Sequence, residues 1–259
     1  MVGSYYQTYN VSSENVNKSK TGAYVYEDDN CIILYDFWSN GGDSGFEIYN
    51  KTDTDLIVQK DACFFIYNGY ANNYYKNREY TNSESNSALI SKSITGISYR
   101  SYLQTTYASV SKAAGLSTTQ GYSVSVKEEE KIIIPPKSSK LFYEYDLINY
   151  PKRHCELPKY PSSQNTKDVN FDINNSPIKF NNRIVYKIEG NAVRVENKFF
   201  VSKMSNIPRA IMVQRRRKSL CGNTLDSRED YFAIGDKPDM FYIKYQNSDT
   251  QEFGEVIND

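Results

Sequence analysis

The stretch that most constrains the fold is residues 35–69, where alternating segments are separated by turn residues. Phe46 and Ile48 are spaced as on one face of a strand, because strand side chains alternate between two faces. The short polar side chains of residues 50–53 favour a turn, since they bond to their own backbone. The Asn-Gly pair at 68–69 is the one most typical of a tight β-hairpin. The sequence therefore predicts an antiparallel sheet here.

The same pattern of short apolar segments and turn residues continues through most of the chain. Strands are also expected over 24–27, 31–38, 70–75, 131–134, 140–145, 180–188, 192–201, 210–214, 231–234 and 240–245. Residues 28–30 are expected to form the turn between the first two of these strands, and residues 189–191 the turn of a second hairpin. Helical periodicity is almost absent, so the sequence predicts an all-β fold, an antiparallel β-sandwich of the immunoglobulin-like type. The apolar positions expected in its core are Phe46, Ile48, Phe64, Ile66, Ile133 and Val185.

The chain is expected to form one sandwich domain over residues 24–245, with a polar arm at 1–23 and a polar tail at 246–259. Residues 1–4 have neither the charged nor the apolar region of a signal peptide, and their Gly-Ser pair is typical of an expression vector. They are therefore interpreted as a cloning remnant. Residues 5–11 are predicted to form a strand at the edge of the sheet.

Residues 81–126 differ in composition from the rest of the domain, because Ser and Thr dominate them and glycines are scattered between. This composition predicts a long surface insertion in the sandwich. Tyr99, Leu103 and Tyr107 fall near helical spacing. The single short helix that the pattern allows is therefore expected over residues 99–114.

Composition and charge exclude several classes of function. The 259 residues have a formal net charge of zero, so no overall field favours nucleic acid. No apolar run approaches the roughly 18 residues that a membrane-spanning helix requires. The chain is rich in aromatic residues, with 24 Tyr and 12 Phe, which supply buried area and favour strands.

Four segments carry a family pattern: residues 5–11 (YYQTYNV), 45–69 (GFEIYNKTDTDLIVQKDACFFIYNG), 132–138 (IIIPPKS) and 176–206 (SPIKFNNRIVYKIEGNAVRVENKFFVSKMSN). Together they resemble a family of hypothetical lipoproteins of unknown function from gut Bacteroidetes. In that family the first segment follows the cysteine that carries the lipid. The resemblance therefore implies an outer-membrane or surface lipoprotein of the cell envelope whose anchor has been removed. A cytoplasmic or virion location is the alternative if Met1 is the native start.

His154 is the only histidine of the chain, so a hydrolase triad would have to use it and a zinc site would consist mostly of cysteine. Cys155 follows directly, and adjacent side chains of an extended chain point apart, which argues against a catalytic dyad. His154 is therefore interpreted as a surface or packing residue.

The four cysteines lack paired CxxC spacing, which excludes a zinc ribbon. Cys31 and Cys63 lie within apolar strands and are expected to be small buried side chains. Cys155 and Cys221 lie in predicted loops, where free thiols are favoured over a disulfide between the two.

Several acidic and aromatic residues have a structural interpretation beside a functional one. Asp43, Asp53 and Asp55 could offer oxygens to calcium, but no complete calcium loop follows, so they are interpreted as turn residues. Trp38 and the tyrosines of residues 70–75 could stack on sugars, although the same residues suit a sandwich core or edge.

One charge cluster stands out, formed by Arg215, Arg216, Arg217 and Lys218. It follows a predicted strand and is therefore expected in a solvated loop. Contact with lipid phosphates or another polyanion is the functional alternative. No nucleic-acid-binding motif accompanies the cluster, so nucleic acid is not expected as a partner.

No residue set amounts to an active site, so no catalytic, cofactor-binding or metal-binding residue is assigned and no cofactor is expected. The favoured interpretation is a non-catalytic envelope protein, a binding or assembly module for a protein or glycan surface, with membrane association only through a lipid anchor. One alternative is an enzyme that acts on a polysaccharide with a pair of carboxylates. Another is a structural component of a phage or secretion system.

Overall fold

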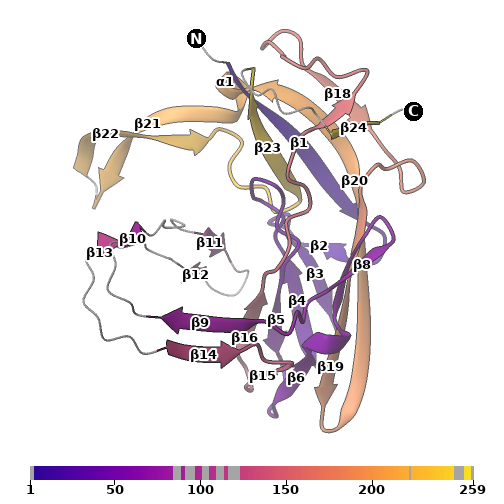
Figure 1. The fold of residues 1–259 in the computed structure, drawn as a ribbon. Coiled ribbons are helices and arrows are strands. Elements are labelled where there is room, and N and C mark those ends of the chain that lie inside the picture. Colours follow the sequence, from indigo (N-terminus) through magenta and orange to yellow (C-terminus); the bar gives the residue numbers. More distant parts are fainter. Residues whose placement is uncertain are drawn as a thin grey trace.

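The structure, a computed structural model, describes residues 3–83, 89–90, 97–100, 105–108, 114–115, 123–221, 223–247 and 254–257. Within these residues the chain forms two main sheets, one of nine strands and one of five, which share an apolar core (Figure 1). The prediction of an all-β, antiparallel sandwich is therefore confirmed. The helices in the described part are one α-helical turn, α1 (Arg209–Met212), and one 3₁₀ turn, η1 (Lys60–Ala62).

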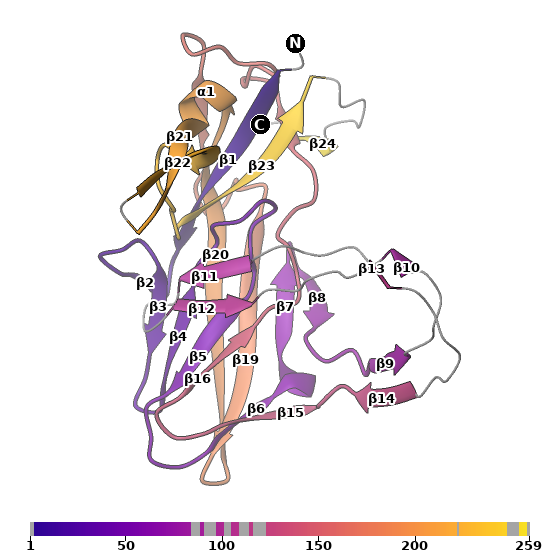
Figure 2. The same ribbon diagram turned by 90° about the vertical axis from the view of Figure 1, so that its left-hand side faces the viewer.

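The larger sheet consists of β1 (Ser4–Ser13), β6 (Leu56–Gln59), β7 (Phe64–Tyr67), β8 (Tyr70–Asn73), β15 (Lys131–Ile134), β18 (Lys167–Asn170), β19 (Lys179–Ile188), β20 (Asn191–Pro208) and β23 (Met240–Gln246). Its main strand order is β15-β6-β19-β20-β1-β23. β20 has 18 residues and runs through both halves of the molecule (Figure 2). It pairs with β19 along residues 191–200 and with β1 along residues 199–208. One continuous strand therefore joins the two halves.

The smaller sheet has the order β16-β5-β4-β3-β2 and consists of β2 (Asn17–Lys18), β3 (Tyr24–Glu27), β4 (Cys31–Tyr35), β5 (Phe46–Asn50) and β16 (Ser139–Phe142). Asp28 forms the predicted turn between β3 and β4. Its Oδ1 accepts hydrogen bonds from the backbone nitrogens of Asn30 and Cys31, both at 2.8 Å. The short side chain therefore supplies the turn chemistry that the sequence indicated.

Two tight hairpins confirm the turn predictions. Glu189 and Gly190 join β19 to β20 with φ angles of 48° and 85°. Asn68 and Gly69 join β7 to β8 with φ angles of 45° and 88°. Positive φ at both central residues is the type I′ geometry, whose twist matches that of the flanking strands.

Aromatic side chains dominate the core, and buried amides satisfy several of their hydroxyls. Tyr9 of β1 stacks on Phe241 of β23, with ring centroids 4.6 Å apart and planes inclined by 6°. The Tyr35 hydroxyl accepts a hydrogen bond from Asn197 Nδ2 at 2.8 Å. Buried polar groups need such partners because an unpaired one costs about 1–3 kcal/mol. The core therefore consists largely of packed aromatic rings, and buried amide side chains form hydrogen bonds with tyrosine hydroxyls.

The core prediction was correct for Phe46 and Ile48, which are buried. It was out of phase by one residue in β7, where Phe65 is buried and Phe64 and Ile66 are half-buried. Both neighbours of Phe65 are apolar, so alternation in the sequence did not identify the inward face.

The same error occurred in two other strands. Ile133 was expected in the core but is 58% exposed, whereas the next residue, Ile134, is buried. Val185 is only partly buried and lies between the buried residues Ile184 and Tyr186. In each strand consecutive apolar residues left the register undetermined.

Other differences concern topology. Residues 5–11 were expected at a sheet edge, but β1 pairs with β20 on one side and with β23 on the other, and its residues 6–9 are all buried. Residues 210–214 were expected to be a strand, but α1 occupies 209–212. These contacts join segments far apart in the chain, which local patterns do not reveal.

Parts of the expected insertion are also described. β9 (Glu79–Ser83) pairs with β14 (Ser123–Lys127). The expected helix over 99–114 is wrong where the chain is described, because β11 (Ile97–Arg100) pairs with β12 (Thr105–Ala108), and Ala114 belongs to β13 (Ala114–Gly115), the partner of β10 (Leu89–Ile90). The rest of residues 81–126, and with it most of that expectation, lies outside the described residues.

Candidate functional site

His154 occupies the end of β17 (Lys152–His154) and is buried, with 3% exposure. Its ring lies edge-on to Phe171 with centroids 6.0 Å apart, and Nδ1 accepts a hydrogen bond from the backbone nitrogen of Glu156 at 3.2 Å. Cys155 is exposed beside it. His154 therefore serves local packing and turn formation, as one of the two interpretations predicted.

The cysteines lie as the sequence indicated. Cys31 and Cys63 are buried, Cys155 and Cys221 are exposed, and all four are free thiols. Burial raises the pKa of Cys31 to about 12 and that of Cys63 to about 11, so both are protonated at neutral pH.

The three aspartates considered as calcium ligands have different surroundings. Asp43 is buried and accepts a hydrogen bond from the Gly45 nitrogen at 2.7 Å. Asp53 is exposed and pairs with Lys137 at 3.1 Å, and Asp55 is also exposed. In the described part of the chain, no three His, Cys, Asp or Glu side chains are grouped for metal binding.

The aromatic candidates divide between packing and surface. Trp38 packs edge-on against Phe232 with ring centroids 4.9 Å apart, and 5.1 Å from the ring of Tyr242. Tyr74 is fully buried, whereas Tyr70 is 79% exposed. Tyr74 is therefore a core residue, Trp38 is half-buried against Phe232 and Tyr242, and Tyr70 is the most exposed of these three.

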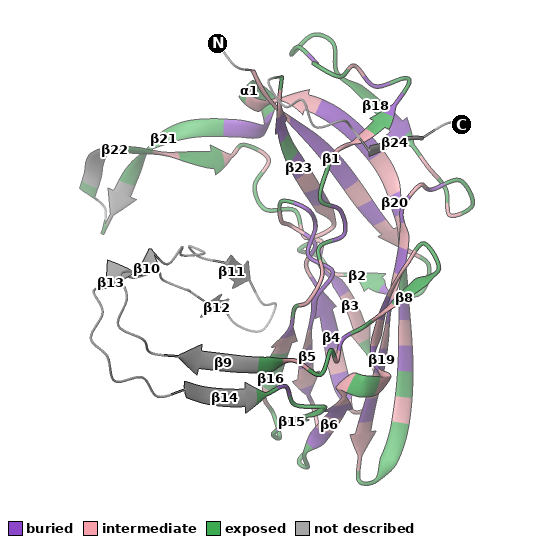
Figure 3. Ribbon diagram, viewed as in Figure 1, coloured by how far each residue is buried: buried purple, intermediate pink, exposed green. Residues whose placement is uncertain are grey.

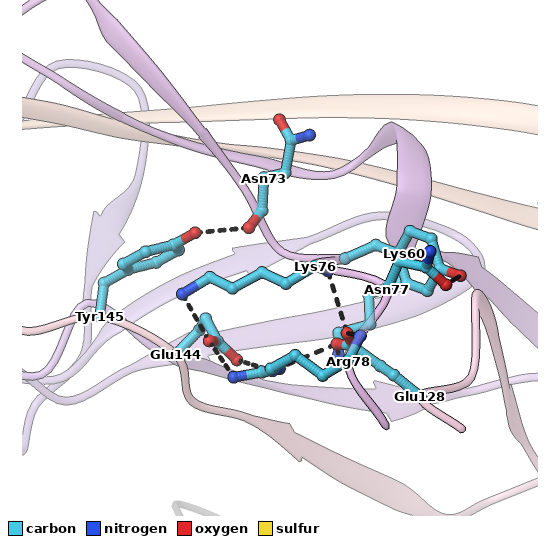
Figure 4. Close-up of polar contacts among 9 residues, drawn as sticks. Lys60, Asn73, Lys76, Asn77, Arg78, Glu128, Glu144 and Tyr145 are labelled. Atoms are coloured by element: carbon cyan, nitrogen blue, oxygen red, sulfur yellow. Dashed lines mark hydrogen bonds and ion pairs between the residues drawn. The ribbon is translucent and has the colours of Figure 1, made fainter. Parts of the chain in front are cut away.

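A network of ion pairs, not foreseen from the sequence, lies where β9 and β14 leave the sandwich (Figure 4). The Glu128 carboxylate accepts bonds from Lys60 Nζ, from the backbone nitrogens of Lys76 and Arg78 at 3.0 Å each, and from Arg78 Nη2 at 3.2 Å. Glu144 binds Arg78 through two bonds of 2.7 and 2.6 Å and Lys76 Nζ at 2.8 Å. Lys76 Nζ also lies 4.3 Å from the ring centre of Tyr145.

The electrostatics of this network favour the ionised carboxylates. Burial alone would raise the pKa of Glu128, but the bonds from Lys60, Arg78 and Lys76 outweigh it and lower the pKa to about 2. The pKa of Glu144 is also lowered, because the bonds from Arg78 and Lys76 outweigh its burial. With all its charges paired, the network can anchor both ends of the β9–β14 segment but offers no free group for chemistry.

A hairpin of β21 (Val213–Leu220) and β22 (Asn223–Phe232) projects from the body of the sandwich (Figure 1). An apolar cluster fixes its base. In this cluster Met212 and Val213 are buried against Tyr6, and Trp38 and Phe232 pack onto them. Beyond this base the described residues of the hairpin are mostly exposed (Figure 3).

The hairpin contains the basic cluster, which lies in β21 and not in the loop that was expected. The expectation of solvent exposure was correct, because Arg215, Arg216, Arg217 and Lys218 are all exposed. Strand geometry divides them between two faces, because successive side chains alternate.

One face of the hairpin carries most of its unpaired positive charge. Arg215 lies opposite Asp230, and Arg217 lies opposite Arg228, so these four share a face. Asp230 is paired with Arg209 at 2.5 Å. Among the side chains that the structure describes, Arg215, Arg217 and Arg228 have no ion-pair partner within 4.0 Å. We call this surface, formed by Arg209, Arg215, Arg217, Arg228 and Asp230, the arginine face.

The other face is internally paired. Lys218 binds Glu229 at 2.5 Å, and Glu229 also accepts a hydrogen bond from the Tyr231 hydroxyl at 3.0 Å. Arg216 donates to Gln214 at 2.8 Å. Substitutions on this face can therefore serve as controls for substitutions on the arginine face, because both faces belong to the same two strands.

An open pocket of about 490 Å³ lies at the arginine face. Its lining consists of Arg209, Arg215, Arg228 and Asp230 of the arginine face, together with Glu229, whose carboxylate pairs with Lys218. All five residues are charged. Such a lining can hold a polar anion through guanidinium groups and can accept hydrogen bonds from a ligand's hydroxyls. The sequence indicated the cluster at 215–218 but not Arg228, which pairing across the hairpin brings near, or Arg209, which begins α1 and contacts Asp230 at 2.5 Å.

A second group of interest is Asp36, which follows β4. Burial raises its pKa to about 6, the hydrogen bond from the Trp38 nitrogen opposes this rise, and the charge of Asp236 adds to it. A carboxyl group with this pKa exchanges protons near neutral pH.

The fold and these sites together define an antiparallel β-sandwich with a projecting, positively charged hairpin. Comparisons of the chain with protein-family models, with curated proteins and with solved structures found no match. In the part of the chain that is described, no helix has both the length and the apolar character needed to cross a bilayer.

Proposed function

We propose that this protein is a non-catalytic binding module of the cell envelope and that it binds its partner through the β21–β22 hairpin. The observation that carries the proposal is the arginine face, which lies on a projecting hairpin and surrounds an open pocket. Charged groups kept without partners on a rigid scaffold are typical of recognition surfaces, because an internal partner would remove their value for binding.

The anchoring of the hairpin supports this role. Its first residue pair, Val213 and Phe232, lies in an apolar cluster with Trp38 and Tyr242, so the base of the hairpin is fixed to the sandwich. A fixed base holds the exposed part in one orientation, which lowers the entropy lost on binding. The same residues in a flexible loop would lose more conformational entropy on binding.

The experiment compares the full chain with a variant in which residues 214–231 are replaced by Asn-Gly. Val213 and Phe232 are directly paired, so a two-residue turn between them preserves the hairpin base. Both proteins are tested on immobilised neutral, aminated, carboxylated, sulfated and phosphorylated glycans and on peptidoglycan fragments. We expect binding by the full chain and its loss in the shortened variant, which should still unfold in one cooperative thermal transition. Equal binding by both proteins would refute the role of the hairpin.

The second candidate function is an enzyme that cleaves a polysaccharide with two carboxylates. Asp36 favours it, because its raised pKa of about 6 suits a proton donor and Asp236 supplies a second carboxylate whose charge it senses. The test is release of reducing sugar from the same glycans. Turnover that falls at least about 100-fold in Asp36→Asn would establish this function in place of the first.

A further inference from the structure

We propose that the arginine face binds a sulfate or phosphate ester carried on a glycan. This inference rests on the proposed function of the hairpin and names the class of its ligand. The pocket formed by Arg209, Arg215 and Arg228 would receive the ester group, and Asp230 would accept hydrogen bonds from neighbouring hydroxyls.

Two like charges face each other across the hairpin. Arg217 and Arg228 lie directly opposite each other in the antiparallel ladder. Like charges at such positions destabilise a hairpin, whereas opposite charges stabilise it. An anion bound at Arg228 in the pocket reduces this repulsion, so the charge arrangement of the hairpin favours anion binding there.

The cations of the arginine face differ in whether they have an ion-pair partner. Asp230 neutralises Arg209 through a contact of 2.5 Å, while Arg215, two residues from Arg217 on the same strand, makes no ion pair with any described side chain. Residues two apart on a strand are separated by about 6.6 Å. Arg215, Arg217 and Arg228 therefore lie on one face of the hairpin. Each guanidinium group can form two parallel bonds to a tetrahedral oxyanion.

The lining of the pocket identifies the rest of the ligand. A single ester group does not fill about 490 Å³, so the pocket has space for the molecule that carries it. All five lining residues are charged, which disfavours an acyl chain or an apolar peptide. A sugar combines many hydroxyl donors with a compact ring, and the carboxylate of Asp230 is a strong acceptor for them.

A glycan fits better than the other sources of phosphate. Anionic bilayers usually bind clusters of about four to eight Lys or Arg side chains. Among the described side chains, the arginine face has only Arg215, Arg217 and Arg228 without an ion-pair partner. A nucleic acid usually requires an extended basic stripe and aromatic stacking. The chain as a whole has no net charge, and the arginine face is one confined patch on it.

The experiment measures binding in solution at about 0.15 M salt, where long-range attraction is screened. The probes are a sulfated heparin-type tetrasaccharide, the same tetrasaccharide after chemical desulfation, glucose 6-phosphate, phosphatidylglycerol vesicles and a single-stranded oligonucleotide. The proteins are the full chain, Arg215→Gln/Arg228→Gln and the matched control Arg216→Gln, whose side chain lies on the opposite face. All changed residues are exposed, and unfolding midpoints verify that each variant folds.

We expect the full chain to bind the sulfated tetrasaccharide at least about tenfold more tightly than the desulfated one. The double variant should lose about tenfold in affinity, and Arg216→Gln should stay within about twofold. Equal affinity for the two tetrasaccharides would overturn the ligand class, while the shortened variant described above still decides the role of the hairpin. Tighter binding to vesicles or to the oligonucleotide would overturn the glycan, and unchanged binding by the double variant would overturn the site.

Discussion

Replacing Glu128 by Gln should destabilise the protein strongly, although it replaces only one carboxylate oxygen with an NH₂ group. The Glu128 carboxylate accepts bonds from four donors that belong to Lys60, Lys76 and Arg78, and its side chain is 4% exposed. Glutamine keeps one acceptor oxygen and places an NH₂ group against the remaining donors. Two or more donors then lose their partner in a buried site.

The magnitude follows from the pKa of this group. Its fall from the ordinary value of 4.5 to about 2 is a difference of 4.5 − 2 = 2.5. At 1.36 kcal/mol per pKa unit, this corresponds to about 3 kcal/mol of stability. Removing one partner of a buried ion pair costs about 3–5 kcal/mol in other proteins, so the two lines of reasoning agree. We expect a loss of about 3 kcal/mol at pH 7.

The assay is urea unfolding of the full chain and of Glu128→Gln between pH 7 and pH 2. Because the folded-state pKa of Glu128 is lowered, its stabilisation is complete above pH 4.5 and is lost as the pH falls toward 2. The difference between the two proteins should therefore shrink over this interval. Glu129→Gln is the control, since Glu129 is exposed and adjacent.

Two results would refute this reasoning. A loss below about 1 kcal/mol at pH 7, the range of surface ion pairs, would mean that the network is solvated and weak. A difference that stays constant down to pH 2 would mean that the glutamine acts through shape and not through charge.

Three further predictions concern other groups. Asp36→Asn should stabilise the protein by about 1–3 kcal/mol at pH 8, because burial raises the pKa of Asp36 to about 6. The gain in stability, measured by urea unfolding, should vanish as the pH falls from about 6 toward the ordinary value of 3.8. A gain that stays constant over this range would contradict the prediction. In the native protein Cys155 and Cys221 should react rapidly with Ellman's reagent, whereas the buried Cys31 and Cys63 should react only in guanidinium. Rapid reaction of all four thiols in the native protein would contradict the burial of Cys31 and Cys63. Gly190→Ala should lower stability by about 1 kcal/mol because Gly190 has a φ of 85°, and an unchanged thermal midpoint would contradict this.

Local chemistry in the sequence was sufficient where a turn determines the structure. The Glu189-Gly190 hairpin, the Asn68-Gly69 hairpin and the turn at Asp28 were each predicted, because their residues have few other favourable conformations. The all-β class followed from the same signals.

The sequence was insufficient where a strand has apolar residues on both faces or where partners are distant. In the run before Pro135 nothing distinguishes Ile133 from Ile134, and tertiary packing decides which one is buried. Glu128 lies in a polar run, and its partner Arg78 is 50 residues away, so no local pattern identifies this pair. Arg228 joins the arginine face only through the register of β22, which no local pattern specifies.

The position of β1 has a consequence for how the chain is made. During synthesis its residue Tyr5 leaves the ribosome long before its pairing partners Pro208 and Tyr245. At about 5–20 residues per second, the Tyr-rich strand waits for at least about 10 seconds with its hydrogen-bonding edges open. Such an edge readily pairs with other chains. The centre of the sheet is therefore the part of the nascent protein that depends most on chaperone protection.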